Sequence, residues 1–146
     1  MNFNPRPFRL VYVAGPYRSD TPYNVERNIR RARDVAAAVV MAGHYPIVPH
    51  LCTAHMEGLA PDAQFLAGAL EAMRRCDEVW VAPGWEYSAG TRSELAEAFA
   101  LDMPVHLHDG APLAFANFRA FVCEVARLHA VELGYIDPPT TDPEAC

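Results

Sequence analysis

Hydrophobic and polar positions alternate along this chain between short apolar runs and longer segments with helical periodicity. The short apolar runs predict buried strands, because each is followed by turn or loop residues. We expect these strands at residues 8–14, 45–49, 78–82 and 104–107. The longer patterns predict helices at residues 22–42, 62–75, 91–101 and 113–133. Gly43 is well placed to end the first helix, since glycine adopts a left-handed C-cap without strain.

Strands that alternate with helices predict a parallel sheet covered by helices on both faces. We therefore expect a Rossmann-like or flavodoxin-like three-layer α/β sandwich with a parallel sheet of four to five strands. The pattern predicts one domain over residues 1–136 and a flexible tail at residues 137–146, which contain three prolines. In such folds ligands bind beyond the carboxyl ends of the strands. The loops at residues 15–24, 50–62 and 83–94 are therefore the expected location of a site.

The charged residues narrow the chemistry. All twelve basic residues are arginines, so Schiff-base chemistry and phosphate loops built on lysine are excluded. The net charge of −6 is uneven, because residues 1–33 hold seven arginines and only two acidic residues. We do not expect binding to nucleic-acid polymers, which depends on neutralising many phosphates. The arginine-rich first 33 residues can still hold a small anion.

The four cysteines are dispersed, without a C-x-x-C pair, at Cys52, Cys76, Cys123 and Cys146. This spacing predicts reduced, buried thiols rather than a disulfide framework. The first residues lack the apolar stretch of a signal peptide, and no segment approaches the roughly 20 apolar residues that span a bilayer. We therefore expect a cytoplasmic protein with no membrane partner.

The loop after the first strand begins Gly15-Pro16-Tyr17-Arg18. Gly15 permits a close approach of the backbone, and the following segment can offer amide N–H groups to an anion. Arg18 would add a forked donor that suits phosphate or carboxylate. The alternative is an ordinary turn between strand and helix with one solvated arginine. Spacing alone leaves both interpretations open.

The third loop leads into a helix through Ser88, Gly90 and Thr91, with Glu94 close behind. Hydroxyls and free amides at a helix N-terminus can hold an anion. The alternative is a capping box, in which Thr91 is the N-cap and Glu94 reaches back three residues. A carboxylate at Glu94 could instead project into the crevice and attack or stabilise an electron-poor carbon.

Three short motifs at the ends of predicted strands resemble the nucleoside 2-deoxyribosyltransferase superfamily. They are Tyr12-Val-Ala-Gly-Pro-Tyr-Arg18, Cys76-Asp-Glu-Val-Trp80 and Ser88-x-Gly-Thr-x-x-Glu94. The resemblance covers roughly residues 8–107. Within the superfamily the chain is most similar to a small, often phage-associated branch of unassigned role, and it is also similar to nucleoside 5′-monophosphate N-glycosidases.

The resemblance implies cleavage or transfer at the N-glycosidic bond of a (deoxy)nucleoside 5′-monophosphate. Glu94 would be the nucleophile that attacks the anomeric carbon, as in retaining glycoside hydrolysis, and Tyr12 would orient it. Serine at position 88 is typical of relatives that bind a 5′-phosphate, so Ser88, Gly15 and Arg18 would form one phosphate pocket. The resemblance implies no metal or organic cofactor, and it implies a homodimer or larger homo-oligomer.

The chain departs from this pattern at Ala69. Active relatives carry an aspartate there that serves the leaving base or the sugar. Loss of a general acid costs about 10²–10⁴-fold in rate, and Glu71, Asp62 or His50 could substitute for it. The alternative function is a catalytically inactive nucleotide-binding or sensing module of the same fold.

Other candidate residues have competing interpretations. Four residues close together in the sequence could bind zinc, namely His44, His50, Cys52 and His55. Their spacing matches no strong zinc site. His50 is the best of these for a substrate site, and its alternative is a structural histidine bonded to backbone.

The predicted first helix carries a run of arginines, at positions 27, 30, 31 and 33, which we interpret as a solvated face or a subunit contact. Asn24 shares a helical face with Asn28 and Arg31, so Asn24 is expected to reach the pocket.

Trp85 and Tyr87 could stack on a base, a contact worth about 1–3 kcal/mol. A covering loop without a ligand role is the alternative.

Overall fold

The computed structural model describes residues 8–132, with side chains for residues 8–127. The chain divides into two compact units, and the boundary between them lies between Pro112 and Leu113. The second unit contributes one described helix, α5 (Phe115–Glu132). The single domain predicted over residues 1–136 stays a prediction, and the predicted tail at residues 137–146 lies outside the described residues.

The first unit is built on a sheet of four parallel strands, in the order β2-β1-β3-β4. These strands are β1 (Leu10–Ala14), β2 (Tyr45–Ile47), β3 (Glu78–Val81) and β4 (Val105–Leu107). The predicted α/β fold with a parallel sheet is therefore confirmed, with four strands. Because β2 and β3 pair with β1 on opposite sides, the strand order reverses beside β1. Such a reversal opens a crevice at the carboxyl ends of the strands.

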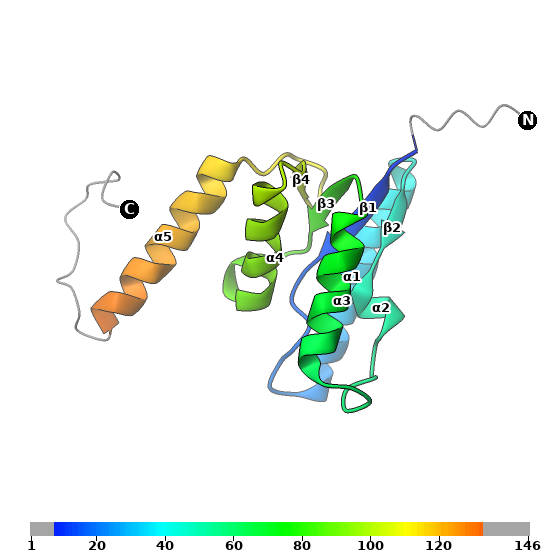
Figure 1. Ribbon diagram of the computed structural model, residues 1–146, viewed down its shortest axis with the longest axis horizontal. Helices are drawn as coiled ribbons and strands as arrows, with labels where there is room; N and C mark the ends of the chain where they lie inside the picture. The colour runs from blue at the N-terminus through cyan, green and yellow to red at the C-terminus, as the bar shows by residue number, and fades with distance from the viewer. Residues whose placement is uncertain (1–7, 133–146) are drawn as a thin grey trace, which may run out of the picture. The chain divides into compact units, whose positions relative to one another are not determined.

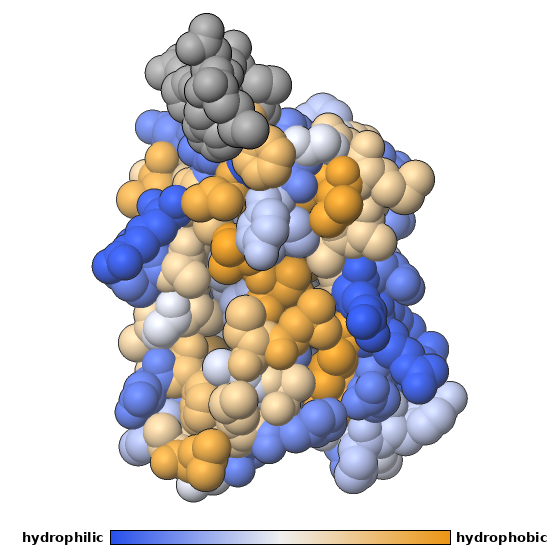
Figure 2. Space-filling model, turned by 90° about the vertical axis from the view of Figure 1, so that its right-hand side faces the viewer, coloured by the Kyte–Doolittle hydropathy of each residue, from blue (hydrophilic) through white to orange (hydrophobic). Residues whose placement is uncertain are grey.

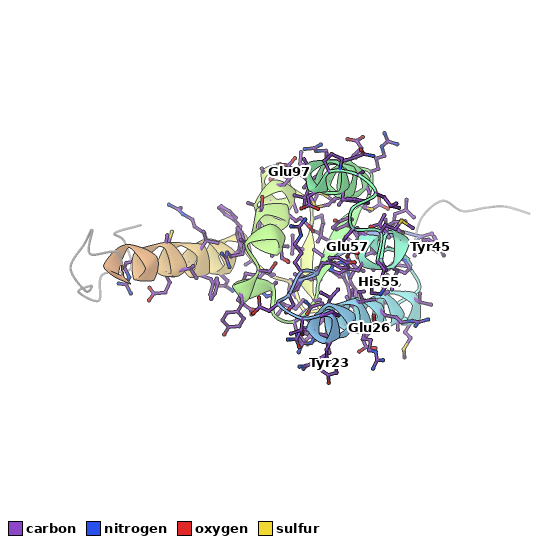
Figure 3. All side chains as sticks on the ribbon, turned by 90° about the horizontal axis from the view of Figure 1, so that it is seen from below. Tyr23, Glu26, Tyr45, His55, Glu57 and Glu97 are labelled. Atoms are coloured by element: carbon purple, nitrogen blue, oxygen red, sulfur yellow. The ribbon has the colours of Figure 1, made fainter. Side chains whose placement is uncertain are left out.

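Helices cover the two faces of this sheet, as Figures 1 and 3 show, with α1 (Pro22–Met41) on one face and α3 (Asp62–Arg74) and α4 (Ala89–Ala100) on the other. Alternate strand residues point to opposite faces. Val11, Val13 and Trp80 pack with α1 in one buried cluster. Tyr12 lies between the two valines in sequence and turns to the other face, where it meets Glu94 of α4. The sheet therefore carries this apolar cluster on one face and the Tyr12–Glu94 pair on the other.

The ends of α1 follow from local chemistry. The Thr21 hydroxyl accepts a hydrogen bond from the Asn24 amide at 3.2 Å, and Pro22 occupies the first helical position. At the other end Gly43 has a φ of +89°, which is the left-handed conformation that glycine favours. The predicted C-terminal stop is therefore confirmed.

Two short elements were not predicted, namely α2 (Pro49–Cys52) and a 3₁₀ turn, η1 (Trp85–Tyr87). Each is at most about one turn long, so neither develops a hydrophobic period that a sequence could display. Both lie in predicted site loops. The helix after η1 begins at Ala89 rather than at the predicted position 91.

The face of the first unit beside edge strand β2 is apolar at its centre, as Figure 2 shows. Exposed large apolar residues come from the strands and helices at this edge, among them Leu10, Val40, Met41 and Leu51. In residues 8–132 no helix is both long enough and apolar enough to cross a bilayer.

The cysteines differ from their prediction. Cys52 and Cys76 are free thiols, but Cys52 is exposed. Cys123 is disulfide-bonded. The prediction of four buried, reduced thiols was therefore wrong for Cys52 and Cys123, and Cys146 lies outside the described residues.

Candidate functional site

A cavity of about 680 Å³ opens at the carboxyl ends of β1 and β3, where the reversal of strand order places it. This volume suits a ligand of nucleotide size. All three predicted site loops contribute to its wall. Ten of the eleven residues that the sequence analysis selected line the cavity: Tyr12, Gly15, Pro16, Tyr17, Arg18, His50, Ser88, Gly90, Thr91 and Glu94.

The polar centre of the cavity is the pair formed by Tyr12 and Glu94. The Tyr12 hydroxyl donates a hydrogen bond to the Glu94 carboxyl group, and burial raises the pKa of Tyr12 above its usual value. Burial also raises the pKa of Glu94 to about 7, although the Tyr12 hydrogen bond opposes this shift. Glu94 Oε2 is buried and has no hydrogen-bond partner in the described residues. The cavity wall therefore includes a carboxyl group with one oxygen that accepts no hydrogen bond from the described residues.

The N-terminus of α4 forms a second polar wall. Ser88 is the N-cap, and its Oγ accepts hydrogen bonds from the Thr91 amide at 3.2 Å and the Thr91 hydroxyl at 2.9 Å. The alternative interpretation of this segment, a capping box with Thr91 as N-cap, is therefore wrong. Because the helix begins at Ala89, Glu94 lies in its second turn, where its side chain bonds to Tyr12. The Ser88 hydroxyl keeps its own proton to donate to a ligand.

His50 holds the loop that follows β1. Its Nε2 lies 2.9 Å from the Gly15 carbonyl oxygen and 3.0 Å from the Pro16 carbonyl oxygen. Two carbonyl acceptors require a proton on Nε2, which therefore donates to both. Burial lowers the pKa of His50, which favours the neutral ring. The interpretation of His50 as a histidine bonded to backbone describes this geometry, and the ring also lines the cavity.

Gly15 is required by the packing of two strand ends. A Cβ at this position would lie 2.7 Å from the Ala82 Cβ, which is inside van der Waals contact. Glycine therefore allows the loop after β1 to pass directly over the end of β3. This close approach brings Pro16 and Tyr17 to the cavity wall.

Ion pairs and hydrogen bonds tie the cavity rim together. The Arg18 guanidinium lies 2.8 Å from the Asp62 carboxylate, and both side chains are largely exposed. The Tyr17 hydroxyl donates to Glu57, and the His55 amide donates to that hydroxyl at 3.1 Å. Figure 3 shows His55 and Glu57 on the loop before α3, with Glu26 of α1 nearby. This network joins the loop before α3 to the loop after β1.

The structure adds residues that the sequence analysis did not select and leaves out one that it did. Asn24 is half-buried in the first turn of α1 and is not part of the cavity wall. Asn28 and Arg31, which share its helical face, do line the cavity. Their i, i+3 spacing was a usable signal, because it places both on one face beside the loop after β1.

The other wall residues that were not selected come mainly from the α2–α3 region and the loop after β3. They include Thr53, Glu57, Phe65, Leu66, Gly84 and Ala89.

Of the two aromatic residues after β3, and of the carboxyl groups that could replace the missing aspartate at Ala69, only some line the cavity. Trp85 is buried outside the cavity wall, whereas Tyr87 lines it and is 91% exposed. Ala69 and Asp62 line the cavity, but Glu71 pairs instead with arginines 74 and 75 on the outer side of α3. No three potential metal ligands among the described residues come together as a group.

Fold and cavity together define an α/β protein with a parallel sheet and a cavity of small-molecule size at the carboxyl ends of its strands. The chain belongs to the family described as "Domain of unknown function (DUF7768)", whose model matches residues 9–108. The match spans the whole sheet and every residue of the cavity wall. No curated protein matches the chain.

Proposed function

We propose that this protein cleaves the N-glycosidic bond of a (deoxy)nucleoside 5′-monophosphate, by hydrolysis or by transfer to another base, with Glu94 as nucleophile. One observation carries the proposal. The Glu94 carboxyl group, hydrogen-bonded by Tyr12, presents a buried and unpaired oxygen in a cavity large enough for a nucleotide. The likeness of three motifs to the nucleoside 2-deoxyribosyltransferase superfamily supports the same chemistry.

The reaction proceeds in two displacements. The Glu94 carboxylate forms a bond to C1′ while the C1′–N bond breaks, and the departing base takes that electron pair and a proton from solvent, which the attacking water of the second step returns. Water or an acceptor base then attacks C1′, and the bond from C1′ to the Glu94 oxygen breaks. Hydrolysis yields the free base and a (deoxy)ribose 5-phosphate, and it restores the carboxylate.

Tyr12 supports this nucleophile in a specific way. Its hydrogen bond lowers the pKa of Glu94 against the opposing effect of burial, so it increases the ionised fraction near neutral pH. It also occupies one side of the carboxyl group and leaves Oε2 for attack. Tyr12 is therefore the positioning residue for Glu94.

The phosphate of the substrate would bind at the N-terminus of α4. Ser88 has a proton to donate, and the amides of Ala89 and Gly90 have no acceptor among the described residues. Arg18 lies at the same cavity but is paired with Asp62, so it would exchange that partner for the phosphate. The turn at Gly15 brings backbone close to this end of the cavity.

The proposal includes a cytoplasmic location, because phosphorylated nucleosides do not cross membranes unaided. It includes a homodimer or larger homo-oligomer, which the apolar face beside β2 supports. It assigns no cofactor, no metal, no nucleic-acid polymer and no membrane as partner.

The alternative function is a nucleotide-binding or sensing module without turnover, and Ala69 is the observation that favours it. Ala69 lines the cavity where the resemblance places an aspartate for the leaving base. Asp62 also reaches the cavity, but its side chain is paired with Arg18 at 2.8 Å. Without a proton donor the base departs slowly, although the cavity still binds nucleotide.

The test is release of free base from a panel of ribo- and deoxyribonucleoside 5′-monophosphates, followed by chromatography. Glu94→Gln should abolish the release. Glu97→Gln is the matched control, since Glu97 lies on the same helix outside the cavity and pairs with Arg74. Nucleotide binding without base release would favour the binding module, and the absence of both would refute both functions.

A further inference from the structure

Arg31 differs from the other arginines of α1. Arg27, Arg30 and Arg33 are exposed, whereas Arg31 is half-buried and lines the cavity. A Cβ at Gly84 would lie 4.0 Å from Arg31 Nη1 and 3.6 Å from Pro16 Cγ. The guanidinium therefore lies where the loop after β1 meets the loop after β3.

The position of Arg31 connects it to the N-terminus of α4. Gly84 immediately precedes η1, and η1 ends at Tyr87, next to Ser88. Arg31 thus lies at one end of this short turn and the Ser88 hydroxyl at the other, and both line the same cavity. A ligand group that accepts hydrogen bonds from the α4 N-terminus would therefore lie in the same cavity as the positive charge of Arg31.

The charge of Arg31 is uncompensated in the described part of the chain. Arg18, the other arginine of the cavity, pairs with Asp62 at 2.8 Å. Among the cavity carboxylates, Glu57 accepts from Tyr17, and Glu94 accepts from Tyr12. No hydrogen bond or ion pair to the Arg31 side chain occurs within residues 8–127.

Such an arginine is suited to an anionic ligand. The guanidinium of a half-buried arginine in a cavity wall gains most from a partner that accepts two parallel hydrogen bonds. Phosphate offers this geometry. A phosphate would also bring negative charge into a cavity that already holds three carboxyl groups, so binding requires a cation that is not already neutralised.

We infer that Arg31 is the specificity-determining residue for the phosphate, and that it selects nucleoside 5′-monophosphates over nucleosides. The inference rests on the proposed function and assigns the main charged contact to Arg31 rather than to Arg18. Ser88 and the free amides of α4 complete the phosphate site. Arg18 must give up its ion pair with Asp62 to reach the phosphate, so its contribution is the smaller one.

Isothermal titration calorimetry with the full chain, which measures the affinity for each ligand, tests this assignment. The ligands are (deoxy)nucleoside 5′-monophosphates, the matching nucleosides and ribose 5-phosphate. Arg31→Gln should weaken binding of monophosphates and of ribose 5-phosphate by about 10- to 100-fold, the value of charge-assisted hydrogen bonds. Its affinity for nucleosides should stay within about twofold of the wild type.

Three further variants separate the possible explanations. Arg27→Gln removes the same charge from an exposed position on the same helix and should leave all affinities unchanged. Arg31→Lys keeps the charge but loses the fork, so its affinity should be intermediate. Arg18→Gln should lose less affinity for phosphate than Arg31→Gln, and the reverse order would overturn the assignment. Melting temperatures establish that each variant is folded.

The inference and the proposed function fail in different ways. Unchanged phosphate affinity in Arg31→Gln refutes the role of Arg31 but leaves the function standing. If the wild type binds ribose 5-phosphate through Arg31 but binds no nucleotide, the proposed function is wrong and the phosphate site remains. If the wild type binds none of these ligands, both are refuted.

Discussion

The Tyr12 hydroxyl of β1 donates a hydrogen bond to the Glu94 carboxyl group of α4, across the face of the sheet that lacks the α1 core. Burial and this bond act in opposite directions on Glu94, and burial dominates, so its pKa is about 7. A nucleophile must be ionised. At neutral pH only about half of the molecules would therefore carry a reactive carboxylate.

The first prediction is a pH dependence of base release. The value of kcat/KM should rise about tenfold per pH unit below pH 7 and level off above it, because it follows ionisation of Glu94 in the free enzyme. Initial rates between pH 5 and pH 9 with one nucleotide measure this profile. A rate that instead declines above pH 7 would indicate that Glu94 donates a proton.

Removal of the Tyr12 hydroxyl should move this profile. Tyr12→Phe takes away the donor that lowers the pKa of Glu94, so the rise in kcat/KM should shift to higher pH. We expect a loss of about tenfold at pH 7, with partial recovery at pH 9. Tyr45→Phe, at an exposed position on β2, is the control and should leave the profile in place. An equal loss at every pH would contradict the role of Tyr12 in ionising Glu94.

The same carboxyl group should make the fold less stable in base. Its pKa is 4.5 in the unfolded chain and about 7 in the folded one, so the folded state binds more protons between these values. Stability therefore falls as pH rises from about 4.5 to about 7. Glu94→Gln does not titrate. It should be more stable than the wild type at pH 8 by about 1–3 kcal/mol, since Glu94 is partly exposed.

Urea unfolding of both proteins at pH 5 and pH 8 provides the measurement. The stability difference between them should shrink toward pH 5, where the wild-type carboxyl group is protonated when folded. A difference that is the same at both pH values would show that the substitution acts through packing rather than through charge.

The hydrophobic and polar pattern of the chain was sufficient to predict the strands and the loops that line the cavity. The run that contains Tyr12 is apolar throughout, and the run that contains Trp80 is apolar except for Glu78, because both faces of a parallel sheet are covered. Glycine and proline after these runs marked the loops at the carboxyl ends. Since parallel strands end at one edge, residues as distant as Gly15 and Glu94 could be assigned to one cavity.

Contacts between residues far apart in the chain could not be predicted from the sequence. The ion pair between Arg18 and Asp62 joins the loop after β1 to the start of α3, and no local periodicity indicates it. The distinction between Arg31 and its exposed neighbours likewise depends on how α1 lies against the loop after β3. The choice of Ser88 over Thr91 as N-cap depends on η1, which is too short to leave a pattern.

The position of Ala69 yields a prediction of gained activity. Ala69→Asp would place a carboxyl group at the cavity wall on α3. If the protein lacks a proton donor for the leaving base, this substitution should raise the rate of base release by at least about tenfold, within the usual range of general acid catalysis. Ala67→Asp adds the same charge at an exposed position on the same helix and should have no effect.

Single-turnover assays compare the two variants with the wild type. Equal rates in Ala69→Asp and wild type, with base release present in both, would mean that another group already protonates the base. In that case Asp62→Asn, which removes the remaining carboxyl group of α3 from the cavity, should abolish most of the activity.

Gly15 offers a test of how closely the site depends on the contact between β1 and β3. A Cβ at position 15 would lie 2.7 Å from the Ala82 Cβ, so Gly15→Ala must displace the loop or the strand end. We expect a loss of about 1–3 kcal/mol in the free energy of unfolding, typical of an overpacked core. Gly90→Ala should be neutral by comparison, because a Cβ there meets no atom within 4 Å.

The double variant Gly15→Ala/Ala82→Gly removes the clashing methyl group and should recover most of the lost stability. Chemical denaturation of the wild type, Gly15→Ala, Ala82→Gly and the double variant measures the coupling between the two positions, and additive losses in the double variant would show that the two positions do not share this contact.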